Sequence, residues 1–80
     1  MRAENDAPGA VQAYAAALRD WPRAPWAADA TVKLALALVA TDRKTQACAA
    51  LGEFTRRYAE GAAPAIRTRA GQVRTRAACS

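Results

Sequence analysis

The chain has 80 residues, which allows one small domain whose hydrophobic core is only marginally sufficient. Hydrophobic residues make up 52% of it, and the many alanines among them favour closely packed helices, whereas scattered β-branched residues argue against strands. The net charge of +5 suits an anionic partner, and the absence of His removes the commonest general base and metal ligand.

Residues 1–9 are polar and predict a frayed, disordered leader ahead of the first helix. They contain no apolar segment like that of a signal peptide, so the sequence indicates a cytoplasmic protein or a piece of a longer exported chain. A first helix is expected over residues 10–21. Its apolar residues recur at the spacing of one helix face: Ala10, Tyr14, Ala17 and Leu18. Pro22 and Pro25 should end this helix and keep the connection extended.

A second helix is expected over residues 25–40, because Pro is well suited to the first turn of a helix. Residues 34–38 are apolar on all sides, which is typical of a helix that is buried on two faces. The apolar run ends at residue 40 and is too short to cross a bilayer, so no membrane insertion is predicted. Asp42 falls in the next turn, where a left-handed backbone is usually required and Asp is tolerated.

A third helix is expected over residues 43–58 and a fourth over residues 64–78, with the helix breaker Gly61 between them. The apolar stripes of these helices are Ala47, Leu51, Phe54 and Tyr58 in the third, and Ile66, Ala70, Val73 and Ala77 in the fourth. Because the fourth helix has one apolar face and otherwise polar faces, we expect it to cap the end of a stack.

The first and third helices match at a fixed offset, at which Ala10 corresponds to Ala47 and Tyr14 to Leu51. Such internal similarity indicates a helical repeat of the tetratricopeptide class. The predicted fold is therefore all-α, with antiparallel hairpins in a right-handed stack over residues 10–80. The stack would comprise a half repeat, one complete repeat and the C-terminal capping helix. Trp21 and Tyr58, at equivalent helix ends, are predicted to pack between repeats.

Three stretches carry a family resemblance: RDWPRAPWAADA at residues 19–30, KLALAL at 33–38, and QACAAL at 46–51 followed by RRY at 56–58. They resemble the C-terminal tetratricopeptide domain of the Tol–Pal-associated cell division coordinator family, CpoB or YbgF. The resemblance implies a periplasmic scaffold that contacts TolA. It also implies a role in coordinating peptidoglycan synthesis with outer-membrane constriction during cell division.

If the repeat assignment holds, the second helix lines the concave surface of the stack and offers a groove for a partner peptide or helix. The candidate groove residues are Trp26, Asp29, Val32, Lys33, Leu36 and Val39. The alternative for Val32, Leu36 and Val39 is packing against a neighbouring helix. The first helix lacks a hairpin partner, so the exposed apolar face of the first two helices also predicts self-association.

Two cysteines leave two interpretations open. Either Cys48 is a small buried residue and Cys79 a thiol at a frayed terminus, or the two form a disulfide. If the third and fourth helices run antiparallel, the start of one lies beside the end of the other. We therefore hypothesise a Cys48–Cys79 bond, which implies an oxidising compartment.

The sequence predicts no catalytic, metal or cofactor site, because no paired carboxylates, phosphate loop, nucleophile motif or ligand cluster is present. The rival function is binding of nucleic acid or an anionic surface through a basic face of the fourth helix. That face would consist of Arg67, Arg69, Arg74 and Arg76. Single-strand binders interleave aromatic residues with their positive charge, and this helix has none, so nucleic acid is disfavoured.

Overall fold

The computed structural model describes residues 7–79, which form four α-helices and no strand. In chain order the elements are α1 (Ala7–Asp20), α2 (Ala27–Ala40), α3 (Lys44–Arg57), the short 3₁₀ helix η2 (Ala59–Gly61) and α4 (Pro64–Arg76). The all-α fold of helical hairpins is therefore confirmed for this part of the chain.

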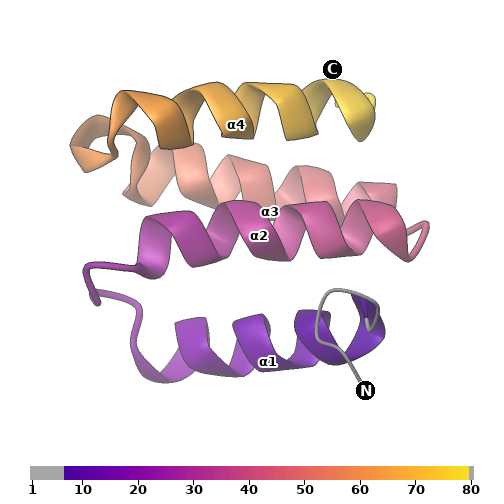
Figure 1. Cartoon of the computed structure of the whole chain (residues 1–80), viewed down its shortest axis with the longest axis horizontal. Coiled ribbons are helices and arrows are strands. Elements are labelled where there is room, and N and C mark those ends of the chain that lie inside the picture. Colours follow the sequence, from indigo (N-terminus) through magenta and orange to yellow (C-terminus); the bar gives the residue numbers. More distant parts are fainter. Residues whose placement is uncertain (1–6, 80) are drawn as a thin grey trace.

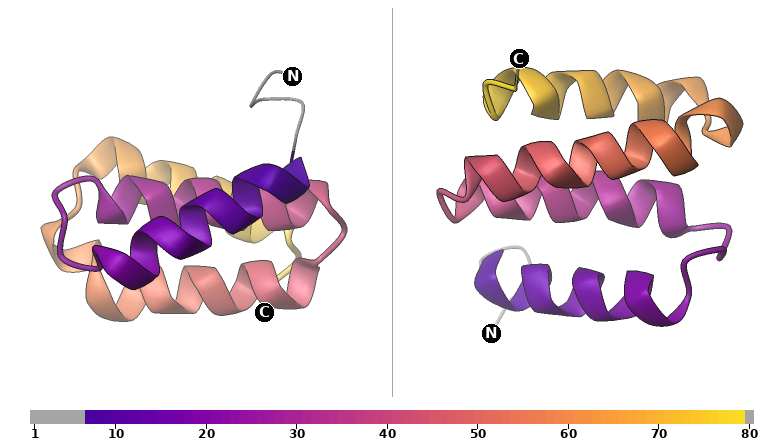
Figure 2. Two further views of the ribbon diagram at one scale, coloured as in Figure 1. Left: turned by 90° about the horizontal axis from the view of Figure 1, so that it is seen from below. Right: turned by 180° about the vertical axis from the view of Figure 1, so that it is seen from behind.

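Consecutive helices run antiparallel, and α2 lies at the centre, where it packs against α1, α3 and α4 (Figure 1 and Figure 2). The molecule is a thin slab of 34 × 29 × 19 Å, because the helices stack side by side. As a result α1 sits at the edge of the stack and packs mainly on α2.

The helix bounds differ from the expected ones mainly around α1. This helix begins at Ala7, so residues 7–9 belong to it and not to the expected leader, whose residues 1–6 lie outside the described part. Pro8 falls in the first turn of α1. Backbone N–H groups in a first turn have no intrahelical acceptor, so the missing N–H of proline costs no hydrogen bond there.

The connection between α1 and α2 was expected to be extended, which is wrong. It folds into tight turns, with the Ala24 amide donating to the Trp21 carbonyl (3.2 Å) and the Ala27 amide donating to the Ala24 carbonyl (2.9 Å). The fixed φ of proline suits the second position of a turn as well as it suits extended chain. The turns delay the start of α2 to Ala27.

Both α2 and α4 end in a Schellman motif with a left-handed residue that is not glycine. Asp42 has φ 60° and Ala78 has φ 56°, so the expected left-handed turn at Asp42 is confirmed. After α4, the Cys79 amide donates to the Arg74 carbonyl (3.1 Å) and the Ala78 amide donates to the Thr75 carbonyl (3.1 Å). The motif thereby turns Cys79 back towards α3.

The hydrophobic core lies between α2, α3 and α4. Its larger cluster consists of Val32, Ala35, Leu51, Phe54, Ala62, Ala70 and Val73, and its smaller one of Leu38, Ala47 and Ala77. The alanines in both clusters allow the helix backbones to approach closely. By contrast, none of residues 8–20 in α1 is fully buried. The edge helix is therefore held by partly buried contacts alone.

Candidate interaction surfaces

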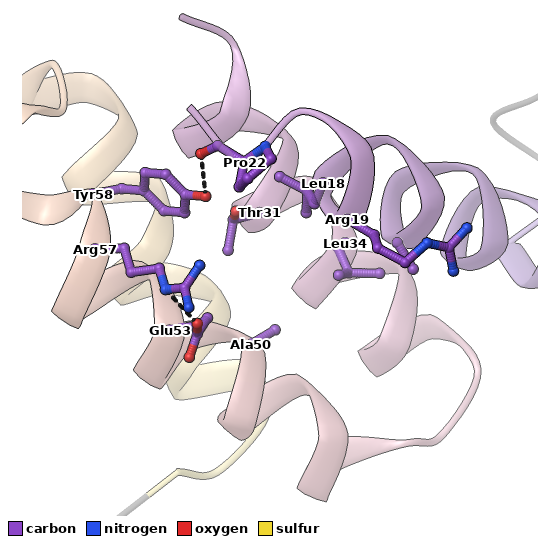
Figure 3. Close-up of a pocket in the computed structure, with 10 residues that line it drawn as sticks. Leu18, Arg19, Pro22, Thr31, Leu34, Ala50, Glu53, Arg57 and Tyr58 are labelled. Carbon is purple, nitrogen blue, oxygen red and sulfur yellow. Dashed lines mark hydrogen bonds and ion pairs between the residues drawn. The ribbon is translucent and has the colours of Figure 1, made fainter. Parts of the chain in front are cut away.

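An open groove of about 290 Å³ runs between α1 and α3, with α2 as its floor (Figure 3). Its lining is largely apolar and comprises Ala15, Leu18, Arg19, Pro22, Thr31, Leu34, Ala50, Glu53, Arg57 and Tyr58. Leu18 and Leu34 are half-buried, so each still presents apolar surface. The buried Thr31 hydroxyl is satisfied, because it donates to the Ala27 carbonyl (2.8 Å). The floor therefore offers no unsatisfied polar side-chain group.

One end of the groove is closed by a bridge between the α1–α2 connection and the end of α3. The Tyr58 hydroxyl donates to the Pro22 carbonyl at 2.8 Å (Figure 3). On the far side of this bridge lies a second hollow, lined by Pro22, Arg23, Ala24, Arg57 and Tyr58. Arg57, Pro22 and Tyr58 thus border both hollows. Tyr58 is half-buried against the larger core cluster and its hydroxyl is bonded to the α1–α2 connection. Trp21, in contrast, is 65% exposed, so its predicted packing role is wrong.

The wall formed by α3 carries an ion-pair network. Arg57 Nε lies 2.7 Å from Glu53 Oε1, and Arg56 donates to Glu53 Oε2. Both oxygens of this carboxylate are therefore engaged. On the opposite wall Arg19 pairs with Asp20 at 3.7 Å, and its guanidinium points away from Arg57 (Figure 3).

The groove predicted on α2 is not the one described above, whose lining includes none of the six residues named for it. Val32 is fully buried in the core among residues of α3 and α4, so its assignment as a groove residue is wrong. Val39 is half-buried against both core clusters. Leu36 and Trp26 are exposed, at 36% and 44%. The interpretation of Val32 as a packing residue is the correct one.

Asp29 and Lys33 pair with each other one helical turn apart, with 2.9 Å between Oδ2 and Nζ. The hydrogen bond to Asp29, and then its negative charge, raise the pKa of the Lys33 ammonium. The positive charge of Arg69 in α4 opposes this rise.

The four arginines of α4 do not form one basic face. A spacing of seven residues is close to two helical turns, so Arg67 and Arg74 share one side, and Arg69 and Arg76 share another. Arg74 Nη2 donates to Thr55 Oγ1 of α3 (3.2 Å), and Arg69 and Arg76 lie on nearly the opposite side of the helix. The positive charge of α4 is therefore divided between its two flanks.

Cys48 of α3 and Cys79 after α4 are joined by a disulfide, with a Cα–Cα distance of 5.6 Å. This confirms the hypothesised pairing and rules out the alternative of two separate thiols. The bond covalently links the first part of α3 to the segment that follows α4.

Three further observations bear on function. No helix in residues 7–79 is long and apolar enough to span a bilayer. Within the same residues, no group of three or more Cys, Asp or Glu side chains is placed to hold a metal ion. In comparisons with known proteins, no family model, curated protein or solved structure matches this chain.

Proposed function

We propose that this chain is a non-enzymatic protein–protein interaction scaffold with tetratricopeptide-like repeats. We further propose that it belongs to a periplasmic, Tol–Pal-associated protein of the CpoB kind, which acts during cell division and contacts a TolA-like partner. The observation that carries the binding role is the open, largely apolar groove between α1 and α3.

The groove has the character of a docking site because its apolar floor is bordered by charged side chains. Its walls at Ala15 and Ala50 are small, which leaves room for a large apolar side chain from a partner. A volume of about 290 Å³ suits one or two side chains of a helix or peptide.

The periplasmic location is supported by the disulfide. Disulfides persist in oxidising compartments and are rare in the cytosol, where thiols are kept reduced. The Cys48–Cys79 bond and the resemblance of residues 19–58 to the CpoB family therefore favour the same compartment.

The test compares two substitutions in α1. Ala15 and Ala13 are both exposed, but Ala15 lines the groove and Ala13 does not. Ala15→Gln should obstruct the groove and weaken binding of a purified TolA-like protein by about tenfold, measured by calorimetry. Ala13→Gln adds the same side chain to the same helix and should leave the affinity unchanged. Equal affinities of the two variants would contradict a role for the groove.

A second copy of the chain is the other occupant to be tested, since self-association is expected from the exposed face of α1 and α2. Light scattering over a range of concentrations should show whether a dimer forms. A dimer that Ala15→Gln disrupts and Ala13→Gln preserves would assign the groove to self-association in place of a TolA-like partner.

The second candidate function, binding to an anionic surface or nucleic acid through α4, is favoured by one observation. Arg67, Arg69 and Arg76 are exposed and are not among the residues of the described part that form ion pairs. Binding that falls steeply with salt and is lost on replacing these arginines would support it.

A further inference from the structure

The positive charge beside the groove is only partly neutralised. Among residues 7–79, Glu53 is the one carboxylate that lines either hollow, and both of its oxygens are engaged by Arg56 and Arg57. Arg57 uses Nε for this contact, and its side chain is 58% exposed. Arg23, which lines the adjoining hollow, is exposed and is not among the residues of the described part that form ion pairs.

This arrangement discriminates between partners by charge. An acidic side chain that reaches the Tyr58–Pro22 bridge would meet the Nη atoms of Arg57 and the guanidinium of Arg23. Guanidinium groups bind carboxylates through short, charge-assisted hydrogen bonds. A basic side chain would meet the same groups with no carboxylate free to receive it, because Glu53 is already occupied.

The apolar part of the site lies directly beside these arginines. Leu18 and Leu34 present partly exposed apolar surface in the groove, and the bridge separates them from Arg23. A partner that uses both parts needs a large apolar side chain and an acidic side chain close together on one face. The two hollows share Arg57 as a common border, so a short segment is enough to reach both.

We propose that the groove recognises an acidic–apolar segment of a partner protein. Its large apolar residue enters between Leu18 and Leu34, and a neighbouring Asp or Glu is bound by Arg57 and Arg23. This inference rests on the proposed scaffold function and adds the chemical nature of the segment that is bound. Arg57 and Arg23 are the residues that select for it.

The probe is a library of short random peptides, displayed and selected on the oxidised protein, with the Ala15→Gln variant used to remove peptides that bind elsewhere. We expect the remaining peptides to be enriched in Asp or Glu next to a Leu, Phe or Trp. One such synthetic peptide is then titrated by fluorescence polarisation. Its affinity should also fall with increasing salt, as expected for contacts between partly exposed charges.

A matched pair of variants tests the role of Arg57. Arg56 and Arg57 are neighbours in α3, and both pair with Glu53, but only Arg57 lines the hollows. Arg57→Gln should weaken binding of the peptide about tenfold, and Arg56→Gln should change it by less than about twofold. Replacing the acidic residue of the peptide with Gln should remove the difference between wild type and Arg57→Gln.

The outcomes separate this inference from the function on which it rests. Peptides that depend on the groove but carry no acidic residue, or that bind equally to both arginine variants, would overturn the inference and leave the scaffold function standing. Failure to select any peptide whose binding is lost in Ala15→Gln would contradict the docking role of the groove, and the inference would fall with it.

Discussion

Within residues 7–79, Asp42 and Ala78 hold a left-handed backbone that glycine adopts most easily. The cost for an L-residue is roughly 1–2 kcal/mol, and alanine has no side-chain hydrogen bond to offset it. The left-handed backbone at Ala78 is maintained by the hydrogen bonds of the Schellman motif and by the bond of the next residue, Cys79, with Cys48. The end of α4 is thus a place where local backbone preference and tertiary structure disagree.

Replacing Ala78 with glycine should therefore stabilise the protein. We expect Ala78→Gly to raise the free energy of unfolding by about 0.5–1 kcal/mol, since relief of strain exceeds the extra entropy of glycine in the unfolded chain. The matched control is Ala49→Gly, at an exposed position inside α3, which should cost about 1 kcal/mol. Thermal unfolding followed by circular dichroism measures both. A loss of stability in Ala78→Gly similar to that in Ala49→Gly would contradict this account.

At the scale of the elements, the four helices differ in how they are held. Helix α2 buries residues such as Ala27, Val32 and Ala35 completely, whereas none of residues 8–20 in α1 is fully buried. Elements with few buried apolar contacts open locally at a lower free energy than the core does. The groove is therefore built between a firmly packed wall, α3, and a weakly packed one, α1.

Amide hydrogen exchange should show lower protection in α1 than in α2. Tyr58→Phe removes the hydrogen bond that ties the α1–α2 connection to the end of α3, at a cost of about 0.5–1 kcal/mol. We expect it to lower the protection of α1 amides roughly threefold to fivefold, with little effect on α2. Tyr14→Phe is the control, because the Tyr14 hydroxyl forms no hydrogen bond with any other residue in the range 7–79. Equal protection of α1 and α2 in the wild-type protein would show that the stack opens only as a whole.

At the scale of the whole molecule, the disulfide compensates for a small core. Helix α4 buries Ala70 and Val73, but it contributes few large apolar side chains and has no side-chain cap at its N-terminus. The Cys48–Cys79 bond spans a sequence separation of 31 residues and fastens the far end of this helix to α3. The chain is close to the size at which such a crosslink decides whether a domain is stable.

Loss of the disulfide should lower the free energy of unfolding by roughly 3–4 kcal/mol, according to the loop-entropy account. Urea unfolding with and without dithiothreitol measures this difference. The Cys48→Ala, Cys79→Ala double variant should have the stability of the reduced protein and should not respond to the reductant. Alkylation under denaturing, non-reducing conditions should add no label to the wild-type protein. Two labelled thiols, or equal stability in both redox states, would refute the role of this bond.

Much of the fold could be predicted from local sequence signals, and the errors have identifiable causes. Pro64 and Gly61 placed the start of α4 correctly, because proline favours a first helical turn and glycine ends a helix. The same local logic failed at residues 22–25, since prolines are compatible with both extended chain and turns. It also misplaced Val32, because spacing along one helix does not say which neighbouring helix covers it.

The sequence by itself determined the number and order of the α-helices and the turn at Asp42. Through the antiparallel order of α3 and α4 it also suggested the Cys48–Cys79 bond, which the tertiary structure decided. These follow from the intrinsic preferences of residues and from chain connectivity. Only the tertiary structure decided where the open groove lies and that Arg57 borders both hollows. It also decided that Arg74 of α4 contacts Thr55 of α3. Such features depend on how the helices rotate and pack against each other. That packing is set by the volumes of side chains that lie far apart in the sequence.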